Sequence, residues 1–161
     1  MTDTPNSTGP RIQPLPRGEW TDAARDVFAF WEGDEARQNG SRSNTMMPLA
    51  TPPPLAMASL DYGKYFMLQS TLEARQVKLL ILRIAHRYGS IYQWTHNALG
   101  AKQIGVTDEE IEAVKLGPDA AVWSAADRLL LKTVDQVGQG GRIDDTTWAE
   151  LTATKNCQQI M

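Results

Sequence analysis

The clearest pattern of apolar residues lies between residues 73 and 88 and predicts an amphipathic helix. Apolar side chains recur there at the i, i+3, i+4, i+7, i+8 and i+11 spacing of one helix face: Val77, Leu80, Ile81, Ile84, Ala85 and Tyr88. Gly89 follows, and glycine favours the position just after a helix. The pattern therefore predicts a helix from Glu73 to Tyr88 with one buried face.

Capping signals predict helices on both sides of this segment. Serine, threonine and aspartate favour helix starts because their side chains accept a hydrogen bond from a free backbone N–H. The other expected helices begin at Thr21, Pro54, Ser90, Thr107, Pro118 and Asp144 or Asp145. Thr107 is followed three residues later by Glu110, which completes a capping box. The sequence thus predicts an all-helical domain of about six to eight helices over residues 17–161.

Other segments lack helical signals. Residues 1–16 are rich in Thr, Ser, Asn and Pro and predict a flexible N-terminal leader. Residues 39–54 contain one glycine and four prolines, which predict a loop, and Gly63 is expected to interrupt the helix that follows this loop. Asn156 begins another capping signal that runs out after about one turn, so the last helix is expected to be truncated.

Composition and charge narrow the classes of function. Hydrophobic residues make up 42% of the chain and charged residues 22%, as in ordinary globular proteins. The formal net charge is -3, and no basic stripe with interleaved aromatic residues suggests a nucleic-acid partner. No apolar run reaches the ~18 residues of a membrane span, and the N-terminus lacks the apolar core of a signal peptide, so a cytoplasmic protein is expected. Cys157 is the only cysteine, which excludes an intrachain disulfide and a cysteine-rich metal site.

The segment from Leu72 to Val106, LEARQVKLLILRIAHRYGSIYQWTHNALGAKQIGV, resembles the carboxymuconolactone decarboxylase family, which includes alkyl hydroperoxidase D. The resemblance covers roughly residues 17–151 and is most specific between Tyr92 and Gly105. It implies an alkyl hydroperoxidase D-like helical fold that assembles as a homotrimer or homohexamer.

The chain departs from the family's peroxidase branch at each position of its motif. That branch carries Cys-x-x-Cys, a histidine four residues after the second cysteine, and a glutamate on the preceding helix. The resemblance puts Ser90 and Gln93 at the cysteine positions, Asn97 at the histidine and Lys78 at the glutamate. Dithiol peroxidase chemistry is expected to be absent, because a thiolate is the required nucleophile. Peroxidase activity is therefore the least favoured function.

The remaining polar residues suggest a cofactor-free enzyme without a metal. His96 is the candidate general acid or base, because an imidazole changes charge near neutral pH. Lys78 and Gln93 are the candidates for polarising or anchoring a small anionic substrate, such as a carboxylated lactone or an aromatic-derived acid. Tyr92, Trp94 and Asn97 are the candidates for lining its binding site.

Each of these residues also has an ordinary structural interpretation. His96 in that case satisfies a carbonyl at an oligomer contact, Lys78 is a solvated cation, and both aromatic residues contribute only to packing. The leading alternative function is accordingly a non-catalytic oligomer that binds a ligand or serves as a scaffold.

Overall fold

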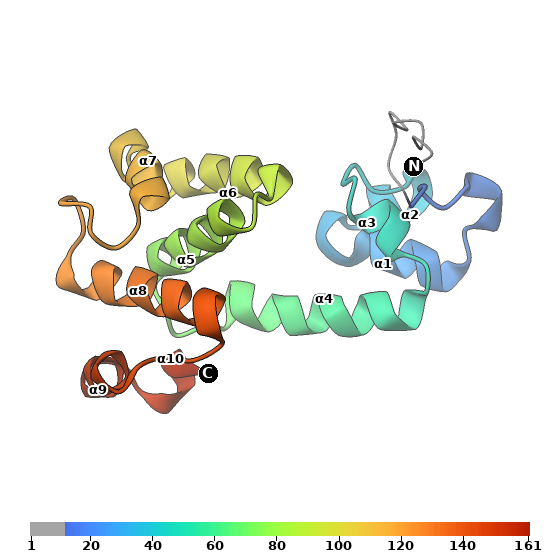
Figure 1. Ribbon diagram of the computed structural model, residues 1–161. Helices are drawn as coiled ribbons and strands as arrows, with labels where there is room; N and C mark the ends of the chain where they lie inside the picture. Colours follow the sequence, from blue (N-terminus) through green and yellow to red (C-terminus); the bar gives the residue numbers. More distant parts are fainter. Residues whose placement is uncertain (1–11) are drawn as a thin grey trace, which may run out of the picture. The chain divides into compact units, whose positions relative to one another are not determined.

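The computed structural model describes residues 12–161, which form helices and connecting turns without a strand. The predicted all-helical class is confirmed. Contacts among the described residues divide them into two compact units, 12–69 and 70–161, where the sequence suggested one domain from residue 17 onward (Figure 1). The predicted leader 1–16 lies mostly outside the described residues. Within residues 12–161, no helix combines the length and apolar character that crossing a membrane requires.

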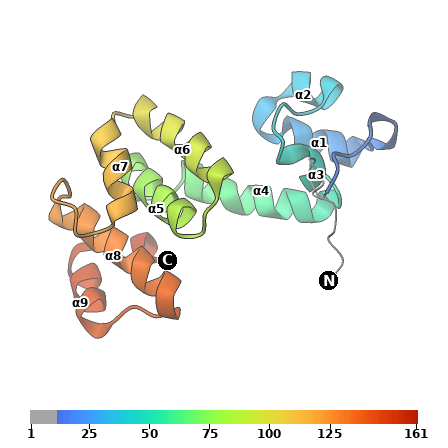
Figure 2. The ribbon, with the colours of Figure 1, turned by 45° about the horizontal axis from the view of Figure 1, so that its top comes forward.

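The first unit consists of several short helices and one longer helix, which share one small core. Its elements are η1 (Arg17–Glu19), α1 (Asp22–Glu32), α2 (Asp34–Asn39), α3 (Met46–Leu49) and α4 (Pro53–Leu68) (Figure 2). Thr21 caps α1 as predicted, because its side chain accepts a hydrogen bond from the Ala24 N–H. Phe28 is fully buried, and the Trp20 ring meets it edge-on at 5.1 Å between centroids. Burial of these apolar side chains stabilises the unit.

Two predictions in this unit are wrong. The predicted loop 39–54 contains the short helix α3, whose Met46 and Leu49 pack on the apolar core and so stabilise a turn despite nearby prolines. Helix α4 also runs through Gly63 without interruption. An internal glycine costs only about 1 kcal/mol relative to alanine. The edge-on ring pair of Tyr62 and Phe66, one turn apart, spans the glycine position.

The second unit contains the remaining helices. They are α5 (Ala74–Arg87), α6 (Ile91–Gln103), α7 (Asp108–Leu116), α8 (Ala125–Gly140), α9 (Asp145–Thr154) and α10 (Cys157–Ile160). The predicted caps Ser90, Thr107 and Asp144 each accept a backbone hydrogen bond at the start of their helix. The capping box of Thr107 with Glu110 is confirmed, and so is the single final turn after Asn156.

The predicted start of α8 is wrong. The sequence placed it at Pro118, but residues 117–124 form turns and the helix begins after the cap Ser124. The reason is Trp123, which is buried in the core and whose Nε1–H donates to the Gly117 carbonyl at 2.8 Å. This contact holds the segment as a closed turn in place of a helix.

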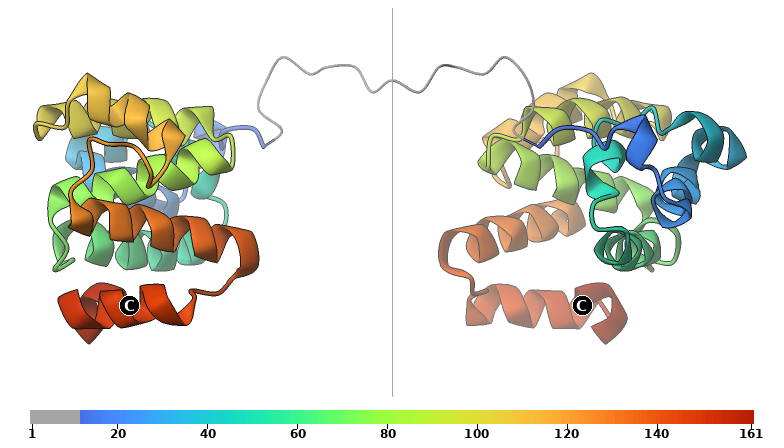
Figure 3. Two further views of the ribbon diagram at one scale, coloured as in Figure 1. Left: turned by 60° about the vertical axis from the view of Figure 1, so that its left-hand side comes forward. Right: turned by 90° about the vertical axis from the view of Figure 1, so that its right-hand side faces the viewer.

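Helix α5 lies at the centre of the second unit, with α6, α7 and α8 packed against it (Figure 3). Its most deeply buried apolar residues are Leu79, Leu82 and Ala85. The predicted buried face is therefore wrong in part, since Ile84 and Tyr88 are exposed. A helix with neighbours on several sides buries more than one stripe, so periodicity alone does not identify the most buried face.

Candidate functional site

Three of the predicted site residues form a hydrogen-bonded chain where α5 meets α6. The Lys78 Nζ donates to the Asn97 Oδ1 at 2.9 Å. The Asn97 Nδ2 in turn donates to the backbone carbonyl of Gln93 at 2.9 Å and to the Gln93 Oε1 at 3.0 Å. Asn97 is buried, whereas Lys78 is half-buried. The buried amide therefore fixes the position of the lysine amine.

Gly100, one turn after Asn97, makes room for the lysine side chain. A Cβ built on Gly100 would lie 3.2 Å from the Lys78 Nζ and 3.4 Å from its Cε. Side chains three or four residues apart on a helix occupy the same face. Gln93, Asn97 and Gly100 thus form one strip of α6 along which the amine lies.

Lys78 differs from the arginines of α5 in its charge environment. Arg75, Arg83 and Arg87 each pair with a carboxylate. Within residues 12–161 no carboxylate lies within ion-pair distance of Lys78, and its hydrogen-bond partner Asn97 is neutral. The amine is thus a half-buried positive charge without a protein counter-ion in the described residues. Such a charge attracts an anion more strongly than a fully solvated one, because it lies in a lower dielectric.

His96 lies on the exposed side of α6. Its ring is parallel to that of Tyr92, with an angle of 4° and 6.1 Å between centroids, and both side chains are exposed. Among the described residues, none forms a hydrogen bond with the imidazole. His96 is one helical turn from Gly100, a separation of about 5–6 Å between neighbouring side-chain positions. The imidazole and the Lys78 amine therefore flank the same part of the helix surface.

Trp94 lies apart from the other predicted residues. It is half-buried, meets His86 edge-on at 5.9 Å, and has the Lys115 Nζ over its ring at 5.1 Å. With His86 and Lys115 it lines a shallow hollow of about 260 Å³. Residues two apart on a helix do not face each other, which separates Trp94 from Tyr92. The structure therefore does not bring the two predicted aromatic walls together.

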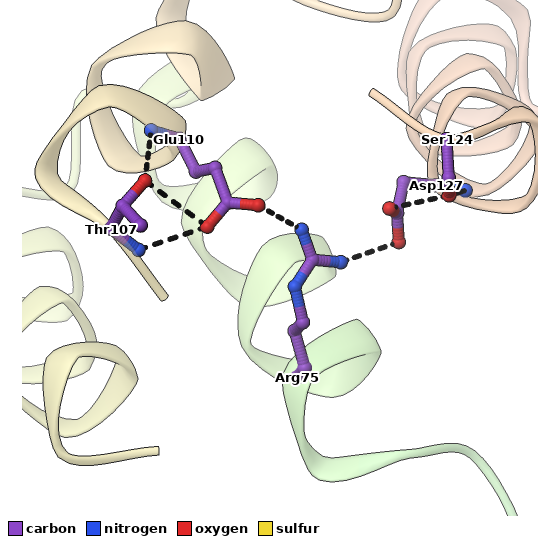
Figure 4. Close-up of polar contacts among 5 residues, drawn as sticks. All are labelled: Arg75, Thr107, Glu110, Ser124 and Asp127. Atoms are coloured by element: carbon purple, nitrogen blue, oxygen red, sulfur yellow. Dashed lines mark hydrogen bonds and ion pairs between the residues drawn. The ribbon is translucent and has the colours of Figure 1, made fainter. Parts of the chain in front are cut away.

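An ion-pair cluster that sequence reasoning missed joins three helices of this unit (Figure 4). Arg75 on α5 binds Glu110 at the start of α7, and it also binds Asp127 at the start of α8, where its Nη1 lies 2.8 Å from the Asp127 Oδ1. Glu110 accepts from the Thr107 N–H at 2.9 Å, and Asp127 accepts from the Ser124 hydroxyl at 2.6 Å. The capping signal of Thr107 was predicted from the sequence, but the cap Ser124 and the bridging arginine were not.

The electrostatics of this cluster favour the charged carboxylate of Glu110. Burial raises the pKa of Glu110, but the hydrogen bonds from Thr107 and Arg75 outweigh it and hold the pKa below its ordinary value. The cluster keeps the starts of α7 and α8 fixed on α5. It thereby supports the helix that carries Lys78, at a position one turn before it.

The start of α6, where the resemblance aligns Ser90 with a cysteine, has an ordinary structural role. The Ser90 hydroxyl accepts from the Gln93 N–H at 3.4 Å as the cap of α6. Cys157 is exposed on α10. Within residues 12–161, no three His, Cys, Asp or Glu side chains gather closely enough to hold a metal ion.

No family model, curated protein or solved structure matches the chain.

Proposed function

We propose that this protein is a cofactor-free enzyme of the carboxymuconolactone decarboxylase type that acts on a small carboxylated lactone or aromatic-derived acid. The observation that carries the proposal is the Lys78 ammonium, held by the Asn97 amide without a carboxylate partner among the described residues. The sequence resemblance supports it further, because it aligns this part of α5 and α6 with the family's site.

Lys78 is the binding group for a substrate carboxylate. A carboxylate that accepts a hydrogen bond from an ammonium gains about 1.5–3 kcal/mol, more than a neutral hydrogen bond supplies. Asn97 occupies only one of the three lysine donors, so the others are available to a ligand. Gln93 lies on the same strip, and its amide offers a further polar contact.

His96 is the proton-transfer group. In a decarboxylation the bond between the substrate carbon and its carboxylate breaks and CO2 leaves. The electron pair of the broken bond stays on the substrate carbon. A protonated His96 then donates its proton to that carbon and becomes neutral. Tyr92, stacked on the imidazole, limits the orientations of the ring and offers an apolar surface to the substrate.

The carboxylate at Lys78 is not the one that is lost. An ion pair with a leaving carboxylate would stabilise the ground state more than the transition state, and so slow the reaction. The substrate therefore carries a second acidic group that keeps its charge throughout.

A non-catalytic ligand-binding protein is the second candidate, and the environment of His96 favours it. Within the described residues nothing hydrogen-bonds the imidazole, whereas catalytic histidines are usually oriented by a second group. In this case Lys78 binds the anion and no reaction follows. We also propose that the protein assembles as a homotrimer or homohexamer, which would cover exposed aromatic residues such as Trp31 and Phe66.

Titration calorimetry with adipate, a small dicarboxylate, tests the binding role of Lys78. We expect Lys78→Met to raise the Kd for adipate at least about tenfold, which corresponds to 1.4 kcal/mol. Lys102→Met is the matched control, because Lys102 lies in the last turn of α6, is exposed and already pairs with Asp108. Equal affinity of wild type and Lys78→Met, both shown to be folded by thermal melting, would contradict the proposal.

Turnover of carboxylated lactones, followed as CO2 release, distinguishes the two candidate functions. On a substrate that wild type converts, His96→Ala should lower kcat about 100-fold or more with little change in affinity. Lys78→Met should act mainly by raising KM. Adipate binding without turnover of any carboxylated lactone or aromatic acid would favour the ligand-binding protein, and a folded His96→Ala variant with wild-type kcat would remove His96 from the site.

A further inference from the structure

A second concave surface of the 70–161 unit lies away from the hydrogen-bonded chain of Lys78. It is a groove of about 320 Å³ between α5, α8 and the two C-terminal helices. Its apolar walls include Leu80, Ile84, Leu130, Val134, Val137 and Leu151. Ile84 and Val137 are about half exposed, at 47% and 49%, so the groove opens to the surface. Its volume is at the lower end of the range of small-molecule sites, about 300–1,000 Å³.

One end of this groove is polar. Tyr88 and Gly138 both line it, and the Tyr88 hydroxyl makes only a long contact of 3.4 Å to the Gly138 carbonyl. The Arg87 guanidinium lies next to the glycine, on the side where a side chain would be. A Cβ built on Gly138 would be 3.0 Å from the Arg87 Nε and 3.3 Å from the Tyr88 hydroxyl oxygen. A hydroxyl donor and a cation therefore flank the same point.

The charge at this end is incompletely balanced. Arg83 and Arg87 share one carboxylate, Asp135, which leaves a surplus of one positive charge in the cluster. Arg83 takes both Asp135 oxygens and also donates to the Val114 and Lys115 carbonyls. Arg87 makes a single 3.0 Å bond to Asp135, and its buried Nε–H has no partner in the described structure. A buried donor without an acceptor is destabilising, so an acceptor placed here is favoured.

We propose that the groove binds a small amphipathic carboxylate, such as a medium-chain fatty acid. The alkyl chain lies along the apolar walls, and the carboxylate lies at the Tyr88 end, where it accepts a hydrogen bond from the hydroxyl. A small shift of the Arg87 guanidinium brings its free Nε–H to the same carboxylate. The charge surplus selects an anion over a cation, and the apolar walls select an alkyl chain over a small inorganic ion.

Calorimetry with the full chain and decanoate below its micelle concentration tests this site. We expect saturable binding of one decanoate per chain. Decyltrimethylammonium, which has the same alkyl chain and the opposite charge, should bind at least about tenfold more weakly. Equal affinity for both amphiphiles, or no saturable decanoate binding, would overturn the proposal.

Matched variants locate the site. Ile84→Gln should weaken decanoate binding at least about tenfold. Ile104→Gln should leave it unchanged, because Ile104, the residue that follows α6, lies outside the groove and is similarly exposed (44% against 47% for Ile84). Tyr88→Phe should weaken decanoate binding about fivefold or more, because the hydroxyl is lost. Tyr62→Phe should have no effect, because Tyr62 belongs to the first unit; its exposed fraction of 70% is close to the 67% of Tyr88. These side chains are exposed, so the variants are expected to fold.

Each alternative has a distinct result. Decanoate binding that both groove variants leave unchanged would place the ligand elsewhere and overturn the proposal. A fall in the particle mass of Ile84→Gln by light scattering, with no decanoate binding by wild type, would identify the groove as a contact between copies of the chain. If a groove variant does not fold, the comparison of the two amphiphiles on wild type still decides.

Discussion

Removal of Arg75 should destabilise the 70–161 unit more than removal of an exposed arginine. In Arg75→Met the Glu110 and Asp127 carboxylates lose their shared partner, and their side chains are 20% and 7% exposed. Breaking a buried ion pair by deleting one partner costs about 3–5 kcal/mol. Arg75 itself is 29% exposed, and both carboxylates keep their cap hydrogen bonds, so we expect a loss of about 2–3 kcal/mol.

Urea denaturation followed by helical circular dichroism and tryptophan fluorescence measures this loss. Arg142→Met is the control, since Arg142 and Asp145 are 80% and 98% exposed and lie 3.6 Å apart, and such pairs contribute about 0–1 kcal/mol. The triple variant Arg75→Met, Glu110→Gln, Asp127→Asn should recover part of the stability, because no unpaired charge remains and glutamine still completes a capping box. If Arg75→Met lost no more stability than Arg142→Met, the cluster would not hold α7 and α8 on α5.

Two further predictions concern acid stability and assembly. Hydrogen bonds hold the pKa of Glu110, through Thr107 and Arg75, and the pKa of Asp135, through Arg83 and Arg87, below their ordinary values despite burial. The folded state therefore binds fewer protons than the unfolded state, so stability should persist above the ordinary carboxyl range and fall as the pH drops through the lowered values. Melting curves from pH 7 to about pH 3 would check this. Arg75→Met should flatten this dependence, and an unchanged curve would contradict the assignment. Light scattering at micromolar concentration should give the mass of three or six chains of 17.8 kDa, and a stable particle of one chain would contradict the proposed assembly.

Helix starts were predictable because their causes are local. The caps Thr21, Ser90, Thr107 and Asp144 act on N–H groups within three residues, so a single sequence contains the whole interaction. The start of α8 was not predictable in this way. It depends on the buried Trp123 and its hydrogen bond to Gly117, a tertiary contact that overrides the helical pattern after Pro118.

The candidate site was predictable only in part, for the same reason. The resemblance brought Lys78 and Asn97 together as site positions, and the structure puts them in direct hydrogen-bond contact. It gave no basis for separating Trp94 from Tyr92, which follows from the packing of Trp94 with His86 and Lys115. Nor did any pattern within α5 indicate that Arg75 bridges two carboxylates that are 35 and 52 residues away in the sequence.

The chemistry of arginine and lysine explains how α5 combines a stabilising role with the proposed binding of an anion. Arginine presents a planar fork of donors that matches carboxylates, and Arg75 and Arg83 use it to join helices that are distant in sequence. Lysine is a single point charge on a flexible stem, and Lys78 contacts one neutral amide. A ligand carboxylate that approaches Lys78 thus displaces no acid among residues 12–161, whereas at Arg75 or Arg83 it would have to break an ion pair that holds the unit together. The arginines therefore fix the position of α5, and this fixed position is what makes the charge of Lys78 available at a defined place for an anion.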